Sequence, residues 1–430
     1  TATSFYNERQ RVEIDLIKRL MTDEAYGIGK NGEIFDVTFG LYAEKELTAA
    51  DGTVIPADGL IEIISLDENG NGKVKTDLPI GSYYAKELAT NSAYILNGQK
   101  YPVTFEYAGQ ETATVHITAN DGEAIENDII YGSVSGKKSD EDGNALGGAV
   151  IGIFKTGTEK FTTENAIQTT VTAADGSFSF EKVPYGTWVI REIESPTGFV
   201  LSEEEITVTI GAVDEVVEIE LVNYFIKGNI ELTKVDKDYP DNKLIGAEFE
   251  VYADTNGDGK LDNGDNLLGT MTELDGGVYQ MKELRYGKYL VREKTAPTGF
   301  VLDENVYSVS IEENGKTYIV ENEVGVGFVN AAQKGSLKIV KTSSDGKIEG
   351  FSFRVTGANG YDQTFKTDKN GEIFIEGLRI GEYTVSEVSD SVSAGYILPA
   401  DKQATVKVGA TTIVEMHNEL RDTPKTGDDF

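Results

Sequence analysis

Three short sequence strings recur along this chain and limit what it can fold into. The first has a glycine, an apolar residue two positions later and a lysine six positions later. It reads GSVSGKK at 132–138, GNIELTK at 228–234 and GSLKIVK at 335–341, and VEIDLIK at 12–18 lacks only the glycine. The second has a glutamate six residues after a glycine, as in GKYLVRE at 287–293, and the third is an asparagine that ends an apolar stretch. Such self-similarity indicates tandem copies of one domain.

Each copy contributes one lysine, one glutamate and one asparagine. The asparagine precedes the next lysine by a constant spacing (127 to 138, 223 to 234 and 330 to 341), and Asn7 precedes Lys18 by the same spacing. We therefore expect residues 1–7 to be the remnant of a preceding repeat, and the natural protein to extend further toward its N-terminus. The recurring residues are Lys18, Lys138, Lys234 and Lys341; Glu87, Glu192, Glu293 and Glu387; and Asn127, Asn223, Asn330 and Asn418.

Between these strings, short stretches rich in Val, Ile, Tyr, Phe and Thr alternate apolar with polar residues. Turn signals such as DEDGN at 140–144 and DKNGE at 368–372 separate them. This pattern predicts an all-β fold of tandem antiparallel β-sandwiches. We expect repeats 1 to 4 at 8–131, 132–227, 228–334 and 335–420, followed by a tail at 421–430. Because no Gly/Ser-rich or Pro-rich linker separates them, we expect a monomeric, elongated and fairly stiff chain.

Composition excludes several classes of function. The chain carries 73 acidic against 39 basic residues, a net charge of −34, which disfavours binding to nucleic acid or anionic lipid. It contains no cysteine, so neither disulfides nor Cys-ligated metals stabilise the domains. No phosphate-binding loop, dinucleotide-binding glycine motif or HExxH motif occurs, so the sequence offers no basis for an enzyme that turns over a substrate.

The recurring lysine, glutamate and asparagine are predicted to face the apolar side of their strands. Residues two apart on a strand share a face, and counting back from Lys234 gives Leu232 and Ile230. Burying an ammonium and a carboxylate costs several kcal/mol each unless they are compensated. One interpretation is a buried ion pair with a hydrogen-bonded asparagine.

The alternative interpretation is chemical. Burial lowers the pKa of a lysine and raises that of a glutamate, so a neutral amine could attack the asparagine carboxamide while the protonated glutamate donates to its carbonyl oxygen. The attack expels ammonia and leaves an intramolecular Lys–Asn isopeptide bond. The fourfold recurrence at fixed offsets favours this self-modification, which is a single-turnover event.

The repeats resemble the collagen-adhesin B-type, SpaA-like, prealbumin-like domains of Gram-positive surface proteins and pilins. Residues 289–300, YLVREKTAPTGF, are similar to the family's E-box, Y-x-L-x-E-x-x-A-P-x-G-Y, and repeat 2 keeps Glu192, Pro196, Gly198 and Phe199. The tails of repeats 1 and 4 depart further from it. The resemblance implies prealbumin/immunoglobulin-like sandwiches with lysine on the first strand, asparagine on the last and glutamate between them. It thereby implies the triads Lys18/Glu87/Asn127, Lys138/Glu192/Asn223, Lys234/Glu293/Asn330 and Lys341/Glu387/Asn418.

Two positions have competing candidates. Lys137 adjoins Lys138, and Asn322 competes with Asn330; the constant spacing favours Lys138 and Asn330.

The family context implies a cell-surface stalk that holds a head domain away from a Gram-positive wall. One alternative is an adhesin that binds a host protein or glycan through the long loops at 21–34 and 44–59. Another is a pilus subunit.

The C-terminal pentapeptide Thr423-Pro424-Lys425-Thr426-Gly427 resembles the sortase signal L-P-x-T-G, with threonine in place of leucine. The resemblance implies that sortase cleaves between Thr426 and Gly427 and joins Thr426 to peptidoglycan or to a pilin.

The segment 254–265 fits a twelve-residue calcium loop. Its oxygen ligands would come from Asp254, Asn256, Asp258, the Lys260 carbonyl, Asp262 and Asp265. The competing interpretation is an acidic hairpin loop without metal. No cofactor is required by the isopeptide chemistry.

Overall fold

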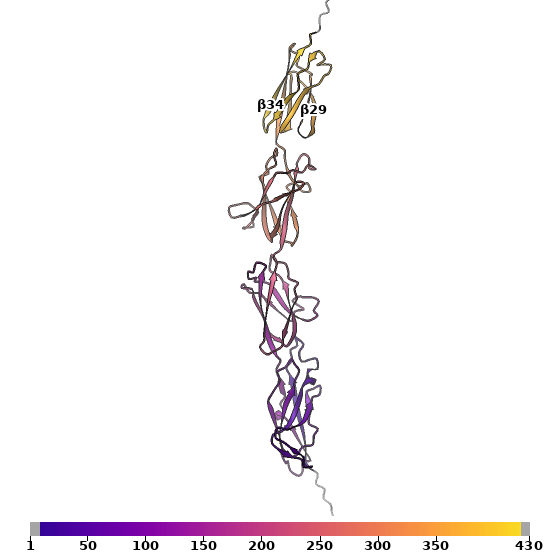
Figure 1. Cartoon of the computed structure of the whole chain (residues 1–430), viewed down its shortest axis with the longest axis vertical. Helices are drawn as coiled ribbons and strands as arrows, with labels where there is room; N and C mark the ends of the chain where they lie inside the picture. The colour runs from indigo at the N-terminus through magenta and orange to yellow at the C-terminus, as the bar shows by residue number, and fades with distance from the viewer. Residues whose placement is uncertain (1–8, 423–430) are drawn as a thin grey trace, which may run out of the picture. The chain divides into compact units, whose positions relative to one another are not determined.

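The computed structural model describes residues 9–422, and its regular secondary structure is almost entirely β-strand (Figure 1). The helical elements among these residues are three single turns, η1 (Glu33–Asp36), η2 (Asn120–Gly122) and η3 (Ala358–Gly360). The all-β prediction is therefore confirmed. The chain divides into two compact units, 1–225 and 226–430, which are described separately below.

Repeat 2, in the first unit, shows the architecture of one domain. One sheet has the order β14 (Ser177–Pro184), β11 (Tyr131–Asp140), β17 (Val216–Asn223). The other has the order β13 (Gln168–Val171), β12 (Val150–Lys155), β15 (Gly186–Glu194), β16 (Ile206–Ile210). The first strand, β11, pairs in parallel with the last strand, β17.

Repeat 1 follows the same plan, except that its last strand is broken into two pieces. In its first sheet, β1 (Arg11–Leu20) pairs with β6 (Asn71–Lys73) and, in parallel, with β9 (Thr114–Thr118) and β10 (Ile125–Asn127). The second sheet has the order β5 (Leu60–Ser65), β2 (Thr38–Ala43), β7 (Gly81–Ala89), β8 (Lys100–Phe105), and β3 (Leu47–Thr48) pairs with β4 (Val54–Ile55).

The second unit contains repeats 3 and 4. In repeat 3, β18 (Lys227–Asp236) pairs with β22 (Val278–Arg285), and in parallel with β25 (Thr317–Ile319) and β26 (Phe328–Asn330); β21 (Thr272–Leu274) flanks β22. Its second sheet runs β20 (Asn266–Thr270), β19 (Glu248–Ala253), β23 (Gly287–Thr295), β24 (Val306–Ile311).

Repeat 4 has an unbroken last strand. Its first sheet runs β30 (Glu372–Arg379), β27 (Lys334–Ser343), β34 (Thr411–Leu420), β32 (Tyr396–Ile397). The second sheet runs β29 (Tyr361–Lys366), β28 (Ser352–Gly357), β31 (Gly381–Glu387), β33 (Lys402–Val406). The first strands of repeats 2 to 4 thus begin at Tyr131, Lys227 and Lys334, one residue before the domain starts expected from the sequence.

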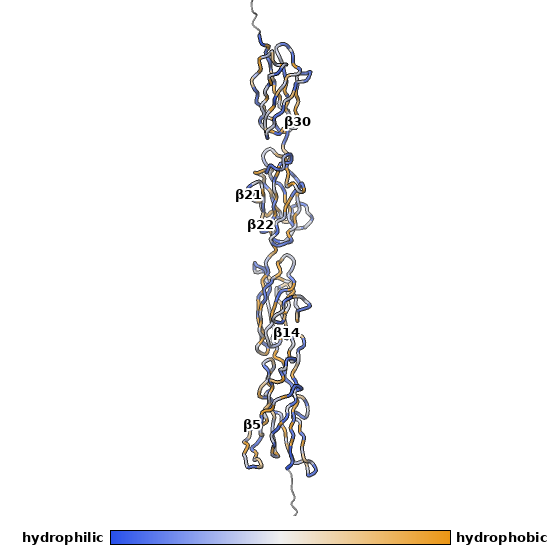
Figure 2. Tube along the Cα trace, turned by 90° about the vertical axis from the view of Figure 1, so that its right-hand side faces the viewer, coloured by the Kyte–Doolittle hydropathy of each residue, from blue (hydrophilic) through white to orange (hydrophobic). Residues whose placement is uncertain are grey.

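The core of each repeat lies between its two sheets, because alternate strand residues point inward. Figure 2 shows hydrophobic and hydrophilic residues interleaved along the traced strands. On β18, Ile230, Leu232 and Lys234 are all fully buried, so the lysine continues the apolar face. Each repeat has its own core cluster, and a smaller one forms around Ala93, Tyr94 and Ile129 in the first unit.

The parallel pairing of first and last strands has the same register in every repeat. The residue two positions after the lysine lies opposite the asparagine: Leu20 opposite Asn127, Asp140 opposite Asn223, Asp236 opposite Asn330 and Ser343 opposite Asn418. Because residues two apart share a face, this register places the lysine and asparagine side chains next to each other on the inner side of the sheet.

Loop 21–34 of repeat 1 contributes to the core of repeat 2. Tyr26 is only 5% exposed, and its ring lies edge-on to Trp188 with a centroid separation of 4.6 Å. Gln168 Nε2 donates to the Tyr26 hydroxyl at 3.0 Å. This part of the loop, which the sequence offered as a ligand-binding segment, is therefore occupied by contacts within the first unit.

The Tyr26 side chain should stabilise repeat 2 measurably. We expect Tyr26→Ala to lower the free energy of unfolding by about 3 kcal/mol, because a buried aromatic side chain is removed from a packed core. Trp188 is the only tryptophan in the chain. Its emission should therefore shift to longer wavelength as water reaches the ring.

The matched control is Tyr107→Ala, since Tyr107 is 60% exposed. Equal tryptophan emission in both variants would contradict the assigned packing.

Candidate functional site

Each repeat buries one lysine, one glutamate and one asparagine between its sheets. The four lysines are at most 1% exposed and the four asparagines at most 2%. Glu87, Glu192 and Glu293 are at most 3% exposed, whereas Glu387 is only half-buried. The structure thus brings together the residues of each triad that the sequence predicted, with differences between repeats.

Repeats 1 and 2 place the three groups in mutual contact. In repeat 2, Lys138 Nζ donates to Asn223 Oδ1 and lies 3.3 Å from Glu192 Oε1. Asn223 Nδ2 donates to both Glu192 oxygens, at 2.8 and 3.0 Å.

Repeat 1 has the same arrangement. Lys18 Nζ is 2.5 Å from Asn127 Oδ1 and 3.3 Å from Glu87 Oε1, and Asn127 Nδ2 is 2.9 and 3.0 Å from the two Glu87 oxygens.

The orientation of the carboxamide differs from the expectation in one respect. The glutamate faces the amide nitrogen of the asparagine, and the lysine amine faces its carbonyl oxygen. The mechanism expected from the sequence instead has the glutamate donate to the carbonyl oxygen. The observed orientation puts the acid beside both the nitrogen that would attack and the nitrogen that would leave.

Burial shifts the lysines toward the neutral, nucleophilic form. Desolvation lowers the pKa of Lys18 and Lys138, although the adjacent Glu87 and Glu192 oppose it. In repeat 3, burial lowers the pKa of Lys234 to about 8 against the opposing effect of Glu293 and Asp303. The neutral fraction of such an amine near neutral pH is therefore far larger than that of an ordinary lysine.

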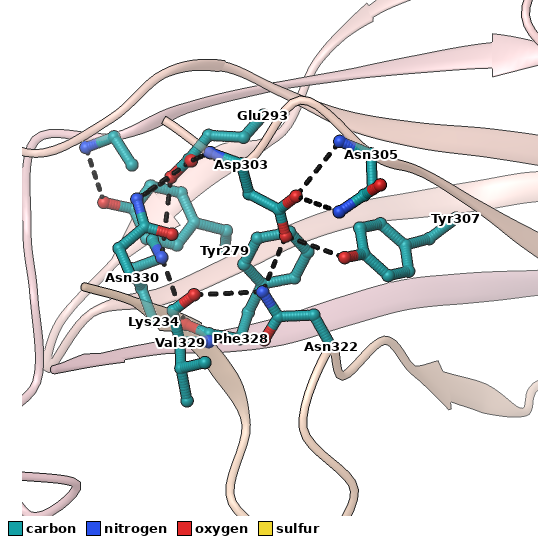
Figure 3. Close-up of polar contacts among 11 residues, drawn as sticks. Lys234, Tyr279, Glu293, Asp303, Asn305, Tyr307, Asn322, Phe328, Val329 and Asn330 are labelled. Carbon is teal, nitrogen blue, oxygen red and sulfur yellow. Dashed lines mark hydrogen bonds and ion pairs between the residues drawn. The ribbon is translucent and has the colours of Figure 1, made fainter. Parts of the chain in front are cut away.

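Repeat 3 assembles the acid and the carboxamide but directs the amine elsewhere (Figure 3). Asn330 Nδ2 donates to both Glu293 oxygens, at 2.8 and 2.9 Å. Lys234 Nζ lies 3.5 Å from Glu293 Oε1 and donates to the main-chain oxygen of Phe328 at 3.1 Å. Asn330 Oδ1 is buried and has no hydrogen-bond partner within the described part of the chain.

Repeat 4 departs further from the arrangement in repeats 1 and 2. Lys341 Nζ donates to the Thr342 carbonyl oxygen at 2.5 Å and lies 4.3 Å from the centre of the Phe351 ring. Asn418 Nδ2 donates to Glu387 Oε1 at 2.6 Å. Burial lowers the pKa of Lys341 and raises that of Glu387. Among the residues described, Glu387 Oε2 and Asn418 Oδ1 are buried without a partner.

One contact to the glutamate was missed by the sequence analysis. In repeats 1 to 3 a main-chain N–H donates to Oε2 of the glutamate: Asn97 at 2.6 Å, Ser202 at 2.7 Å and Asp303 at 2.8 Å. The donor always follows the glutamate by the same number of residues (87 to 97, 192 to 202 and 293 to 303). This constant spacing is the feature of the sequence from which the contact could have been predicted. In repeat 4 the corresponding residue, Ile397, belongs to β32 and pairs with β34 instead.

The competing candidates occupy other environments. Lys137 is exposed and lies 3.6 Å from Asp175 Oδ2, so its side chain points away from Glu192. Asn322 contacts Asp303 and the main chain of Val329.

The carboxylates of segment 254–265 accept hydrogen bonds from the loop's own main chain. Asp254 accepts from the N–H groups of Gly257 at 2.7 Å and Gly259 at 3.0 Å. Lys288 Nζ donates to the Gly257 carbonyl oxygen at 3.1 Å, which places an ammonium beside the loop. Across residues 9–422, no three or more His, Cys, Asp or Glu side chains are grouped so that they could hold a metal ion.

The pentapeptide at 423–427 lies outside the described residues. Within 9–422, none of the helices has the length and apolar character needed to cross a membrane.

Removing the acid of a well-assembled triad should destabilise its domain strongly. We expect Glu192→Ala to cost repeat 2 about 3–5 kcal/mol, because Lys138 stays buried without its counter-charge. Denaturant unfolding followed by Trp188 fluorescence measures this directly, since Trp188 lies in the same repeat.

The control is Glu205→Ala, which removes a surface partner of Arg191 and should cost at most about 1 kcal/mol. Comparable losses in the two variants would show that the buried glutamate has no special role.

Comparisons with known proteins agree with this architecture. A family model described as "SpaA: Prealbumin-like fold domain" matches residues 24–121, 132–224, 228–324 and 335–420. Among solved structures, the Bacillus anthracis TIE protein is 21% identical, with a TM-score of 0.56, over 90% of this chain and 68% of that one. A comparison with curated protein sequences finds no significant match.

Two pilins are more distant in structure. BcpA, the major pilin subunit of Bacillus cereus, is 14% identical over 67% of this chain and 99% of its own, with a TM-score of 0.33. The shaft pilin SpaA from Lactobacillus rhamnosus GG is 16% identical over 46% of this chain and 99% of its own, with a TM-score of 0.23. Since the family model covers most of the chain in four successive matches, the protein belongs to the SpaA family of prealbumin-like fold domains, which it contains in tandem.

Proposed function

We propose that this protein is a structural component of a Gram-positive cell surface, a stalk or pilus subunit whose domains are cross-linked by Lys–Asn isopeptide bonds. The observation that carries the proposal is the buried three-way contact in repeats 1 and 2. There, the lysine amine, the glutamate carboxyl group and the asparagine carboxamide are in contact, and burial lowers the pKa of each lysine. Membership of the SpaA family of prealbumin-like fold domains supports a structural role.

The proposed reaction uses only groups present in the triad. The neutral Lys138 amine attacks Cγ of Asn223, so that an Nζ–Cγ bond forms and the Cγ–Nδ2 bond breaks. Glu192 takes the proton that the attacking nitrogen loses and passes it to Nδ2, which leaves as ammonia. The contacts of Glu192 with both nitrogens support this path. The product is a neutral amide, so the buried ammonium and its desolvation cost disappear.

The bond would connect the first and last strands of each domain. For repeat 3 it would close a loop of about 100 residues, which by analogy with a disulfide stabilises by roughly 4–5 kcal/mol. Because these two strands already lie side by side, the covalent link would also let tension pass across the domain without separating its sheets. Such a link would take the place of the disulfides that this cysteine-free chain lacks.

Attachment to the surface is proposed through the sortase-like pentapeptide at 423–427. Sortase would join Thr426 to peptidoglycan or to a pilin, and the protein would be extracellular. A host ligand for loop 21–34 is disfavoured by the burial of Tyr26, which leaves the segment 44–59 as the remaining candidate for adhesion.

Intact mass spectrometry tests the isopeptide proposal. Each bond removes one ammonia from the mass of the bare sequence. We expect losses from repeats 1 and 2 at least, because their amines already contact the carboxamide, and the least complete loss from repeat 4. Lys18→Arg and Lys138→Arg should each prevent one bond, so each variant should lose one ammonia fewer than the protein without substitutions. A mass equal to that of the bare sequence would refute the proposal.

Segment 254–265 has two competing interpretations, a calcium loop and an acidic hairpin without metal. The hydrogen bonds to Asp254 and the neighbouring Lys288 ammonium favour the acidic-hairpin interpretation. We therefore expect about 1 mM calcium, a concentration typical for extracellular sites, to leave the Tm of the protein unchanged. A rise in Tm that Asp258→Asn abolishes would instead establish a calcium site.

A further inference from the structure

A second carboxamide in repeat 3 holds the strand that carries Asn330. Asn322 Nδ2 donates to the Val329 carbonyl oxygen at 2.9 Å, and the Val329 N–H donates to Asn322 Oδ1 at 2.6 Å (Figure 3). One side chain thus pairs with both main-chain groups of Val329, as a neighbouring strand would.

The position of Val329 makes this contact relevant to the triad. Val329 is the middle residue of β26, which has only three residues and pairs with β18 along one edge. On one side of it, the Phe328 oxygen accepts from Lys234; on the other, the Asn330 carboxamide contacts Glu293. A shift of Val329 would therefore move the amine's acceptor and the carboxamide together.

Asn322 is itself held by a hydrogen-bonded carboxylate. Its Nδ2 donates to Asp303 Oδ2 at 2.7 Å, and the Tyr307 hydroxyl donates to the same oxygen at 2.7 Å. Asn305 donates to Oδ1 through its main-chain N–H at 3.0 Å and its side chain at 2.7 Å. Although burial opposes it, these hydrogen bonds lower the pKa of Asp303, so it is a carboxylate acceptor.

Asp303 also contacts the acid of the triad. Its main-chain N–H donates to Glu293 Oε2 at 2.8 Å. Asp303 therefore connects two parts of the triad. Its main-chain N–H binds Glu293, and its side chain binds Asn322, which in turn holds the strand that carries Asn330. The two halves of the triad are thereby held in one hydrogen-bonded network.

The other repeats show why repeat 3 needs this support. In repeat 2 the last strand, β17, is continuous and pairs with β11 along its whole length. In repeat 3 the equivalent strand is interrupted, because residues 320–327 separate β25 from β26. Repeat 1 is interrupted as well, and there Asn127 Nδ2 has an additional partner in Thr90 Oγ1 at 2.9 Å.

We infer that Asn322 and Asp303 are positioning residues for the isopeptide bond of repeat 3, holding β26 beside β18 and Asn330 against Glu293 where the last strand is broken. The inference rests on the proposed function. Misplacement of reacting groups by about 1 Å can cost roughly a hundredfold in rate, so loss of this support should slow the reaction strongly.

The test measures the rate of ammonia loss from repeat 3. Full-length chains made by cell-free synthesis are quenched in acid at intervals, and the peptides containing Lys234 and Asn330 are analysed by mass spectrometry. We expect Asn322→Ala and Asp303→Ala each to slow cross-linking by about tenfold to a hundredfold. Because Asp303 acts through Asn322, the double variant should be no slower than the slower single variant.

The matched control is Asn229→Ala. Asn229 makes two side-chain hydrogen bonds at the opposite end of β18, accepting from the Glu283 N–H and donating to Thr317 Oγ1, each at 3.2 Å. Its loss should lower the Tm comparably but leave the rate unchanged. If the Asn322 and Asn229 variants cross-link at the same rate as the unmodified chain, or slow equally, the positioning role is refuted.

Failure of the proposed function looks different. If the unmodified chain and Lys234→Arg both keep the ammonia of Asn330, repeat 3 forms no bond and the isopeptide proposal itself fails there. Cross-linking at the unmodified rate in all Asn322 and Asp303 variants would overturn only the positioning inference.

Discussion

The parallel pairing of each domain's first strand with its last is the constraint on which the rest of this structure depends. Its register sets the residue two positions after the lysine opposite the asparagine in all four repeats, so both side chains lie on the inner face. A glutamate from the facing sheet completes the group. Without compensation, a buried ammonium and carboxylate would cost several kcal/mol each. Conversion of the amine into an amide, as proposed, removes that cost.

The four sites differ in the contacts that hold the glutamate and in whether the last strand is continuous. Where a main-chain N–H binds the glutamate and the lysine amine reaches the carboxamide oxygen, as in repeats 1 and 2, all three groups are in contact. In repeat 3 a main-chain N–H still binds the glutamate, but the last strand is interrupted. There the Asn322 side chain pairs with the main chain of Val329. In repeat 4, Ile397 pairs with β34, and Glu387 Oε2 lacks a hydrogen-bond partner among the described residues.

Successive repeats within each unit contact one another. In the first unit, Tyr26 enters the core of repeat 2 beside Trp188. In the second, Arg379 of repeat 4 donates to Asp236 at 2.5 and 2.7 Å and to Asp238 at 2.9 Å. Asp236 lies opposite Asn330 in the β18–β26 register, so one strand end serves both the triad and the contact with the next repeat. Segments that look like free loops in the sequence therefore have structural partners.

The sequence alone was sufficient to predict the all-β class and which lysine, glutamate and asparagine of each repeat face its interior, because strand periodicity and constant offsets are local properties that repeat. It could not show which nitrogen or oxygen of each carboxamide faces the glutamate, that Tyr26 is buried in the next repeat, or that Asp303 links Glu293 to Asn322. Those contacts join residues far apart in the chain. Only the tertiary structure decides them, because they depend on how two sheets and an interrupted strand come together in space.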